Sequence, residues 1–258
     1  MINPAEIKIR NLSIEYKKAK KGFVKAIENI NLDIPRNKIT MIIGPSGCGK
    51  STLLKSINRL HDINEEVSVQ GSLEINGEDI YYSGRPVPEL RRRVGLIHQK
   101  PVPLPLSIFK NIAYGLKIHN NIHKDEVERR VIEALKKVHL WDEVKDRLDS
   151  PAIALSLGQQ QRLSIARAIA IKPEVLLCDE ITSALDPISS GKIEQLLVTL
   201  SEDYTIVWVS HILRQVRRMA DYVVFLYMGR MVECGEKEQF FEDPQDSLTQ
   251  NYIRGLFT

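Results

Sequence analysis

The chain has 258 residues, of which 43% are hydrophobic and 27% are charged, and its formal net charge is +3. This composition is typical of a folded globular protein and excludes a largely disordered chain. The small net charge does not indicate a protein that binds nucleic acid. The three cysteines, Cys48, Cys178 and Cys234, are odd in number and lack metal-ligand spacing, which argues against a disulfide framework and fits a reducing compartment.

Short strands are predicted for the N-terminal part of the chain. Residues 7–14 and 27–34 alternate apolar and polar side chains, a pattern that predicts strands with one buried face. Residues 38–44 form a continuous apolar run, as expected for a strand that is buried on both faces. A glycine-rich loop and then an amphipathic helix follow this run directly.

The middle of the chain has the periodicity of helices. Prolines at 101, 103 and 105 interrupt regular structure, and residues 108–148 then read as helical, with Val127, Val131 and Leu135 on one stripe. From residue 175 onward strands and helices alternate, which predicts a largely parallel α/β sheet. No apolar run approaches the roughly 20 residues that span a bilayer, and the N-terminus lacks a signal-peptide pattern. Any membrane association is therefore expected to depend on another protein.

The sequence GPSGCGKST, residues 44–52, fits the phosphate-loop pattern G-x-x-x-x-G-K-[ST] between a predicted strand and a predicted helix. Its glycines allow main-chain N–H groups to surround phosphates, helped by the positive end of the helix. We expect Lys50 to reach the β- and γ-phosphates and Ser51 to bind Mg²⁺. The candidate ATP-binding residues of the loop are Gly44, Pro45, Ser46, Gly47, Cys48, Gly49, Lys50, Ser51 and Thr52. The motif alone does not separate kinases, GTPases, helicases and transport ATPases.

Two adjacent acidic residues end the apolar segment VLLCDE, residues 175–180. We expect Asp179 to hold Mg²⁺ through water and Glu180 to polarise an attacking water. His211 follows the next predicted strand, from which it would reach the γ-phosphate, and is a further candidate catalytic residue. Gln99 ends the segment GLIHQ, where it would form the hinge between the sheet and the helical region.

The phosphate loop, Gln99, LSLGQQQR, LLCDE, SALD and His211 together resemble the motifs of ATP-binding cassette proteins in order and spacing, over essentially the whole chain. The resemblance implies that two cassettes pair head to tail, with each ATP between the phosphate loop of one subunit and the signature segment of the other. The signature residues Ser156, Gly158 and Gln159 would then contact the ATP that the partner binds. Asp186 would couple the two sites across the dimer.

The same resemblance implies roles for an aromatic residue and for Gln99. Tyr16 would stack on the adenine ring, with Phe23 as the alternative, because the Lys-rich segment between them is longer than usual. Gln99 would contact Mg²⁺ and the attacking water, and its loop would touch a membrane partner. Gln99, Glu180 and His211 are thus the candidate catalytic residues, and Ser51, Gln99 and Asp179 the candidate Mg²⁺ ligands.

The fold that the resemblance implies is a phosphate-loop NTPase core with a largely parallel α/β sheet, an N-terminal antiparallel β subdomain and an inserted α-helical subdomain. We expect one ATPase domain over residues 1–258, with a core of residues 1–98 and 162–258 and a helical subdomain of residues 99–161. The implied cofactors are ATP and Mg²⁺. The implied partners are a second copy, integral-membrane permease subunits and, indirectly, an extracytoplasmic solute-binding protein. The implied location is the cytoplasmic face of the cell membrane.

Two positions depart from the usual pattern of this family. Leu157 replaces the first of two successive glycines in the signature segment, and Ile181 replaces the proline that normally follows the acidic pair. Gly158 is the glycine that is expected to approach phosphate, so we expect activity to survive the first change. The second change is expected to loosen the turn and to shift the rate of hydrolysis without removing a catalytic group.

A finer resemblance concerns the transported solute. The segments LRRRVGLIHQKPVPLPLSIFKNIAYG and LWDEVKDRL and the tail VECGEKEQFFEDP are similar to those of ATP-binding subunits of bacterial phosphate importers. The nucleotide-binding subunit does not touch the solute, so phosphate follows from this resemblance alone. Importers of another oxyanion or of an amino acid remain alternatives.

Two further alternatives lie outside transport. A cassette ATPase that acts on nucleic acid or ribosomes would normally carry paired cassettes, long coiled-coil arms or zinc inserts, whereas this chain has one cassette, no sustained heptads and no cysteine cluster. A small-molecule kinase would use the phosphate loop but has no reason for a signature helix. We therefore expect a transport ATPase with no nucleic-acid partner.

Overall fold

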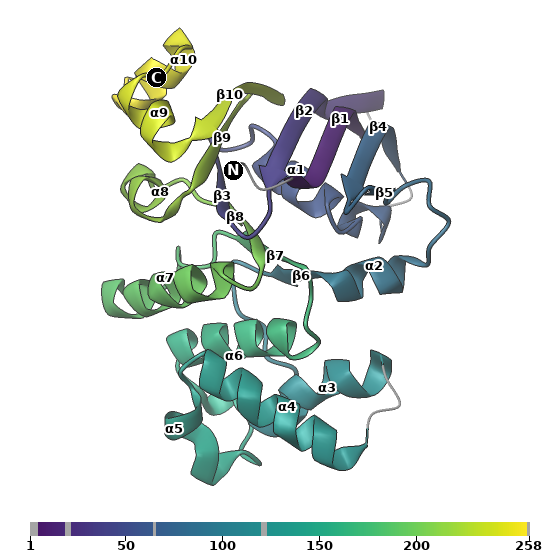
Figure 1. Ribbon diagram of the computed structural model, residues 1–258, viewed down its shortest axis with the longest axis vertical. Coiled ribbons are helices and arrows are strands. Elements are labelled where there is room, and N and C mark those ends of the chain that lie inside the picture. The colour runs from purple at the N-terminus through teal and green to yellow at the C-terminus, as the bar shows by residue number, and fades with distance from the viewer. Residues whose placement is uncertain (1–4, 19–21, 64–65, 120–122, 257–258) are drawn as a thin grey trace. The chain divides into compact units, whose positions relative to one another are not determined.

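The computed structural model describes residues 5–18, 22–63, 66–119 and 123–256. The chain divides into two compact units, Met1–Arg91 with Ser201–Thr258, and Arg92–Leu200. Figure 1 labels the helices and strands of both units. Each unit is described by itself below.

The first unit contains an antiparallel sheet in the order β2-β1-β4-β5. Its strands are β1 (Ala5–Lys18), β2 (Gly22–Pro35), β4 (Val67–Ile75) and β5 (Glu78–Asp79). β1 pairs with β2 on one side and with β4 on the other, as the three neighbouring ribbons in Figure 1 show. The two predicted N-terminal strands are therefore confirmed.

An extra residue in β1 explains why its apolar positions do not keep a strict period of two. Ile7 and Ile9 are fully buried, and the next fully buried apolar side chain is Leu12, three residues further on. The register with β4 shifts between Arg10 and Ser13, which is where a β-bulge places its unpaired residue. Asn11 adopts a left-handed φ of 50° in this bulge.

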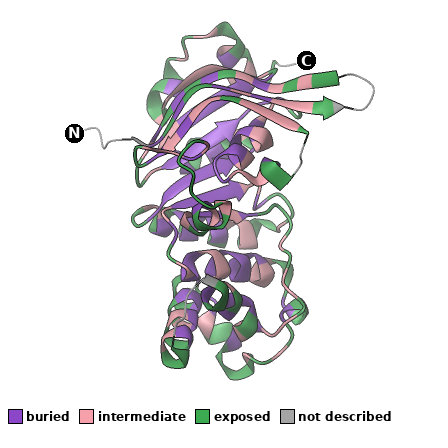
Figure 2. Ribbon diagram, turned by 90° about the vertical axis from the view of Figure 1, so that its right-hand side faces the viewer, coloured by how far each residue is buried: buried purple, intermediate pink, exposed green. Residues whose placement is uncertain are grey.

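The first unit also contains a sheet with buried parallel strands. β3 (Ile39–Ile43) lies between β8 (Thr205–Val209) and β9 (Tyr222–Tyr227), is parallel to both, and is buried at every position. β10 (Arg230–Glu236) pairs antiparallel with β9. The central strands are purple in Figure 2, as expected for a sheet that is covered on both faces.

Short helices complete this unit around the buried strands. They are α1 (Lys50–Ser56), the 3₁₀ helix η1 (Leu60–Ile63), α8 (Leu213–Met219), α9 (Lys237–Glu242) and α10 (Ser247–Ile253). α1 follows β3 through the glycine-rich loop, so the predicted order of strand, loop and helix is confirmed. α2 (Val87–Arg93) runs to the start of the second unit in the chain.

The second unit combines two parallel strands with packed helices. β6 (Val94–Ile97) pairs with β7 (Val175–Asp179), and Ile97 lies opposite Cys178. The helices are α3 (Ile108–His119), α4 (Lys124–Lys137), α5 (Trp141–Val144), η2 (Lys145–Arg147), η3 (Ala152–Ala154), α6 (Leu157–Ala170) and α7 (Pro187–Ser201).

Helices α3, α4 and α6 contact one another pairwise and share an apolar core. Ile112, Val131 and Ile165 are fully buried members of this core, one from each helix. The sequence between residues 108 and 148, predicted to be helical, is divided into several helices; α4 is followed by His139, which has a left-handed φ of 51°. An antiparallel N-terminal sheet, mostly parallel strands elsewhere and a helical region inserted in the chain between β6 and β7 confirm the predicted fold class. Within the described parts of the chain, no helix has the length and apolarity to cross a membrane.

Candidate functional site

Two glycines of the phosphate loop, Gly44 and Gly49, occupy positions where a side chain would clash with the main chain. Gly44 has φ 144°, and a Cβ added there would lie 2.1 Å from the main-chain oxygen of Leu226. Gly49 has φ 106°, and its Cβ would lie 2.7 Å from the main-chain oxygen of Ala26. Both φ values are positive, which glycine adopts without strain, and at both positions the main chain of another segment lies close to the loop. Together these features fix a tight turn of the loop between β3 and α1. Such a curve is the cradle that a polyphosphate requires.

Lys50 lies inside the curve of the loop. Its Nζ donates to the main-chain oxygens of Gly44 and Pro45, each at 2.8 Å, and the residue is 7% exposed. The ammonium group is therefore held among main-chain atoms of the same loop that would surround the phosphates. Ser51 and Thr52 follow in the first turn of α1.

A residue near the C-terminus also contacts the phosphate loop. The ring of Tyr252 stacks on Phe225 with centroids 4.7 Å apart, and Phe225 lies opposite Ile43 at the end of β3. Burial raises the pKa of Tyr252, and a hydrogen bond donated by the backbone of Gly44 opposes that rise. Helix α10 thus braces the first glycine of the loop, a contact that no sequence motif indicated.

His211, Tyr16 and Phe23 belong to the same unit as the phosphate loop. His211 is exposed and comes directly after β8 and the buried Ser210. Tyr16 is partly exposed on β1 opposite Val24, and Phe23 is 55% exposed on β2 opposite Lys17. Both aromatic candidates therefore lie on the hairpin of β1 and β2. Residues 19–21 of its Lys-rich segment lie outside the described residues.

Parallel pairing of β6 and β7 brings Gln99 and Glu180 together in the second unit. The carboxyl ends of the two strands are neighbours, since Ile97 and Cys178 are paired. Gln99 Nε2 donates to Glu180 Oε2 at 3.3 Å and to Ser183 Oγ at 3.0 Å. Glu180 has a left-handed φ of 48°, and Asp179 is the last residue of β7. The positive φ of Glu180 changes the direction of the chain after β7, and the Glu180 carboxylate lies against the Gln99 amide.

The turn after Glu180 accommodates the isoleucine that departs from the family pattern. Ile181 is fully buried, and the Ser183 N–H donates to the main-chain oxygen of Glu180 at 3.0 Å. Ser183 Oγ donates to the same oxygen at 2.9 Å. The turn is thus held by hydrogen bonds and by burial of Ile181.

The signature segment begins helix α6 with a complete capping box. Ser156 Oγ accepts from the Gln159 N–H at 3.3 Å, and Gln159 Oε1 accepts from the Ser156 N–H at 2.9 Å. Leu157, the next residue, is 44% exposed. The hydroxyl of Ser156 accepts in the cap, which leaves its proton to donate to an anion at the helix N-terminus.

Gly158 faces α7 at close range. A Cβ at Gly158 would lie 2.8 Å from Ser189 Oγ and 3.1 Å from Ser189 Cβ, so a larger residue here would displace the Ser189 side chain. Asp186 caps the start of α7 by accepting from the N–H groups of Ile188 and Ser189 at 3.0 Å each. Hydrogen bonds from Ser189 lower the pKa of Asp186 and keep it ionised.

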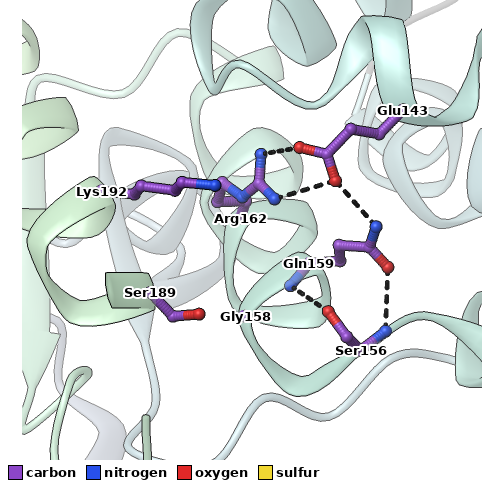
Figure 3. A pocket seen from close by; sticks show the side chains of 7 residues that line it. All are labelled: Glu143, Ser156, Gly158, Gln159, Arg162, Ser189 and Lys192. Carbon is purple, nitrogen blue, oxygen red and sulfur yellow. Dashed lines mark hydrogen bonds and ion pairs between the residues drawn. The ribbon is translucent and has the colours of Figure 1, made fainter. Parts of the chain in front are cut away.

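A cavity of about 170 Å³ adjoins the signature segment, and Figure 3 shows its lining side chains. Glu143 of α5 accepts from Gln159 Nε2 at 2.7 Å and from Arg162 Nη1 and Nη2 at 2.8 and 3.1 Å. The hydrogen bond from Arg162 is the main reason that the pKa of Glu143 is lowered. Glu143 was not among the residues that the sequence motifs single out.

Helix α6 also contacts the segment before Gln99. The fully buried Gln161 donates through Nε2 to the main-chain oxygen of His98 at 3.2 Å. This hydrogen bond fixes the residue next to Gln99 against the signature helix. It joins two sequence motifs that lie more than 50 residues apart.

The residues present fit ATP with Mg²⁺ better than a protein-only metal site. Among the residues that the structure describes, no group of three His, Cys, Asp or Glu side chains could hold a metal ion. Mg²⁺ typically takes one or two protein oxygens and completes its octahedron with water and substrate phosphates. A phosphate cradle with a serine beside it suits that mode of binding, with phosphate oxygens as part of the ligand set.

Comparisons with known proteins match both the sequence and the fold. A family model described as ABC transporter matches residues 27–183. The structure of cbiO1 from Clostridium perfringens, part of the ABC transporter complex cbiONQ, is similar with 27% identity, 98% of this chain and 96% of that chain covered, and a TM-score of 0.80. A dimeric post-hydrolysis structure of the ATP-binding cassette MJ0796, bound to ADP and Pi, is similar with 29% identity, 90% and 98% coverage, and a TM-score of 0.75.

Proposed function

Because the chain belongs to the ABC transporter family of ATP-binding cassettes, we propose that it hydrolyses ATP to drive uptake of inorganic phosphate through a partner permease. The observation that carries the ATPase role is the contact of Gln99 with Glu180 at the adjoining ends of β6 and β7. It pairs a candidate general base with an amide that orients it. The phosphate loop supplies the nucleotide site.

In this proposal the phosphate loop binds the nucleotide of its own chain. Main-chain N–H groups of residues 44–52 surround the phosphates, and Lys50 turns from its own loop oxygens to the β- and γ-phosphates. Ser51, Gln99 and Asp179 are the side chains that would hold Mg²⁺. The bound ion would neutralise charge that develops on the phosphate oxygens. Tyr16, with Phe23 as the alternative, stacks on the adenine.

Glu180 acts on the water that attacks the γ-phosphate. Its carboxylate accepts a proton from that water, while Gln99, which already donates to Glu180 Oε2, keeps the carboxylate oriented. His211 contacts the γ-phosphate from the end of β8. These three side chains are the proposed catalytic residues.

The signature segment acts on the nucleotide of a second copy. Ser156, Gly158 and Gln159 lie at the start of α6, where a helix N-terminus and a serine hydroxyl favour an anion. The dimeric state of the similar cassette MJ0796 with ADP and Pi supports a pair of copies. In the proposed pair the copies lie head to tail, and Asp186 couples the two sites. Closure of the pair on two ATP molecules drives the permease, and hydrolysis reopens it.

Ser156→Ala is expected to lower the turnover number without greatly weakening nucleotide binding by the chain's own phosphate loop. The substitution removes the donor to the partner's γ-phosphate and also a helix cap worth about 1 kcal/mol. Ser156→Asp keeps a capping oxygen but places a carboxylate against the phosphate, so it is expected to lose turnover with a stable fold. Steady-state ATPase rates and equilibrium nucleotide binding measure both effects. A strong loss of binding in the single subunit would contradict the cross-dimer role.

Phosphate is proposed as the solute on the likeness of the helical region and the C-terminal tail to phosphate importers. The permease contacts the helical region in this family, so those segments reflect the partner better than the ATP motifs do. The test is uptake of labelled phosphate by proteoliposomes that contain the native complex, with ATP inside. Uptake that unlabelled phosphate abolishes is expected. Uptake of another oxyanion or an amino acid instead would keep the transport role and reject phosphate.

A further inference from the structure

We propose that Glu143 is the positioning residue of the signature segment, holding Ser156 in place through Gln159 and Arg162. The inference rests on the proposed function, because it concerns how the segment is prepared for the nucleotide of the second copy. It assigns a role to a residue of α5, outside the signature segment itself.

The first link runs through the Gln159 amide. Its Nε2 donates to Glu143 Oε2 at 2.7 Å, and its Oε1 accepts from the Ser156 N–H at 2.9 Å. Both ends of the amide are therefore occupied, as the dashed lines in Figure 3 show. The carboxylate at one end determines where the amide oxygen lies, and that oxygen fixes the main chain of Ser156.

The second link runs through Arg162, one helical turn further along α6. The residue is 7% exposed, and it donates through both Nη atoms to Glu143 and through Nη1 to the His139 oxygen at 2.5 Å. A buried guanidinium requires a carboxylate partner, and loss of that partner leaves an uncompensated charge. Glu143 therefore holds two points on the same helix face.

The geometry is that of a clamp on α6 and not of a general surface ion pair. Glu143 of α5 accepts hydrogen bonds from Gln159 and Arg162 of α6, which lie 16 and 19 residues further along the chain. Glu126 of α4 also binds two arginines, Arg129 and Arg130, but both lie on its own helix within four residues. Both glutamates bind arginine, but of the two Glu143 alone contacts the signature segment.

The cavity beside the clamp explains why small displacements of the segment matter. Ser156, Gly158 and Ser189 line it together with Glu143, and a Cβ added at Gly158 would lie 2.8 Å from Ser189 Oγ. A hydroxyl that grips a phosphate works over hydrogen-bond distances, so a shift of about 1 Å is enough to lose the contact. Lys192 lines the same cavity and helps to keep Glu143 ionised by lowering its pKa, after the larger effect of Arg162.

The test compares Glu143→Gln with Glu126→Gln in the full-length chain. We expect Glu143→Gln to lower kcat about tenfold while the dissociation constant for ATP at the chain's own phosphate loop stays within about twofold, since the charged hydrogen bonds from Gln159 and Arg162 are weakened on helix α6 and none is lost at the phosphate loop. Glu126→Gln is expected to keep the parent kcat. Gln159→Ala breaks the same link from its other end, and the double variant Glu143→Gln with Gln159→Ala is expected to be no slower than the slower single variant.

The outcomes separate this inference from the proposed function. A parent chain that does not hydrolyse ATP overturns both. A parent that hydrolyses ATP, with Glu143→Gln at the parent kcat, overturns the positioning role and leaves the proposed function standing. If Glu143→Gln does not fold, Glu143→Asp decides alone, because it keeps a carboxylate for Arg162 but shortens the reach to Gln159: an unchanged kcat overturns the role, and a lowered kcat with normal ATP affinity supports it.

Discussion

Glu180→Gln is expected to bind ATP with the affinity of the parent chain, to lose at least about 100-fold in turnover, and to accumulate as a closed dimer in the presence of ATP. The amide cannot accept the proton of the attacking water, so the step that reopens the dimer stops. Glutamine keeps one oxygen that can accept from Gln99 Nε2, as Glu180 Oε2 does at 3.3 Å. The fold around the turn should therefore survive.

The control for this variant lies at the other end of the same strand. Glu174 precedes β7 and binds Arg93 through two hydrogen bonds of 2.7 and 3.1 Å. Glu174→Gln removes a carboxylate near β7 without touching its catalytic end, and it is expected to retain the parent turnover. ATPase rates and size-exclusion chromatography with ATP measure both variants. Turnover of Glu180→Gln at the parent rate would remove Glu180 from the mechanism.

Gly44→Ala is expected to destabilise the protein by on the order of 3 kcal/mol or more and to abolish nucleotide binding. The added Cβ would lie 2.1 Å from the Leu226 oxygen and 2.7 Å from Cys48 Sγ. The Leu226 oxygen is a main-chain atom of the buried strand β9, so it cannot move aside without breaking the sheet. The loop itself must deform, and with it the cradle for the phosphates.

Gly47→Ala provides the control within the same loop. Gly47 also has a positive φ, of 76°, but a Cβ there meets no atom within 4 Å. Gly47→Ala is therefore expected to lower the free energy of unfolding only by the cost of placing alanine in the left-handed region, about 1–2 kcal/mol. Thermal or denaturant unfolding of the two variants measures the difference. Equal losses of stability would show that the close approach to β9 does not govern the loop.

Local patterns in the sequence predicted those parts of the site that one continuous segment builds. The apolar run of residues 38–44 and the glycines after it specify β3 and the phosphate loop, because strand burial and positive φ values are properties of neighbouring residues. The Ser156 cap of α6 is likewise local. The exact division of residues 108–148 into several helices was not predicted, because a single apolar stripe does not show where a helix ends.

Contacts between distant segments could not be read from the sequence. Gln99 alone is weak evidence, and its meaning depends on the register that sets β6 beside β7. Glu143 and Tyr252 belong to none of the ATP-binding motifs, and each meets its partner only after helices have packed. An exposed glutamate and a tyrosine near the C-terminus resemble ordinary surface residues until that packing is known.

The two departures from the family pattern are explained by where their side chains lie. Leu157 is 44% exposed next to the Ser156 cap, while a Cβ at Gly158 would press on the Ser189 side chain. Ile181 is fully buried, so it contributes packing to the turn that follows Glu180. Retention of Gly158 and of the turn hydrogen bonds is consistent with an active ATPase.

The most direct test of the transport role is purification of the tagged chain from its native membranes in mild detergent, with mass spectrometry of the proteins that accompany it. The account predicts recovery of integral-membrane subunits with several spanning segments, in a complex whose ATPase activity is lost in the Glu180→Gln variant. Recovery of ribosomal or nucleic-acid-bound proteins alone, with no membrane subunit, would contradict it.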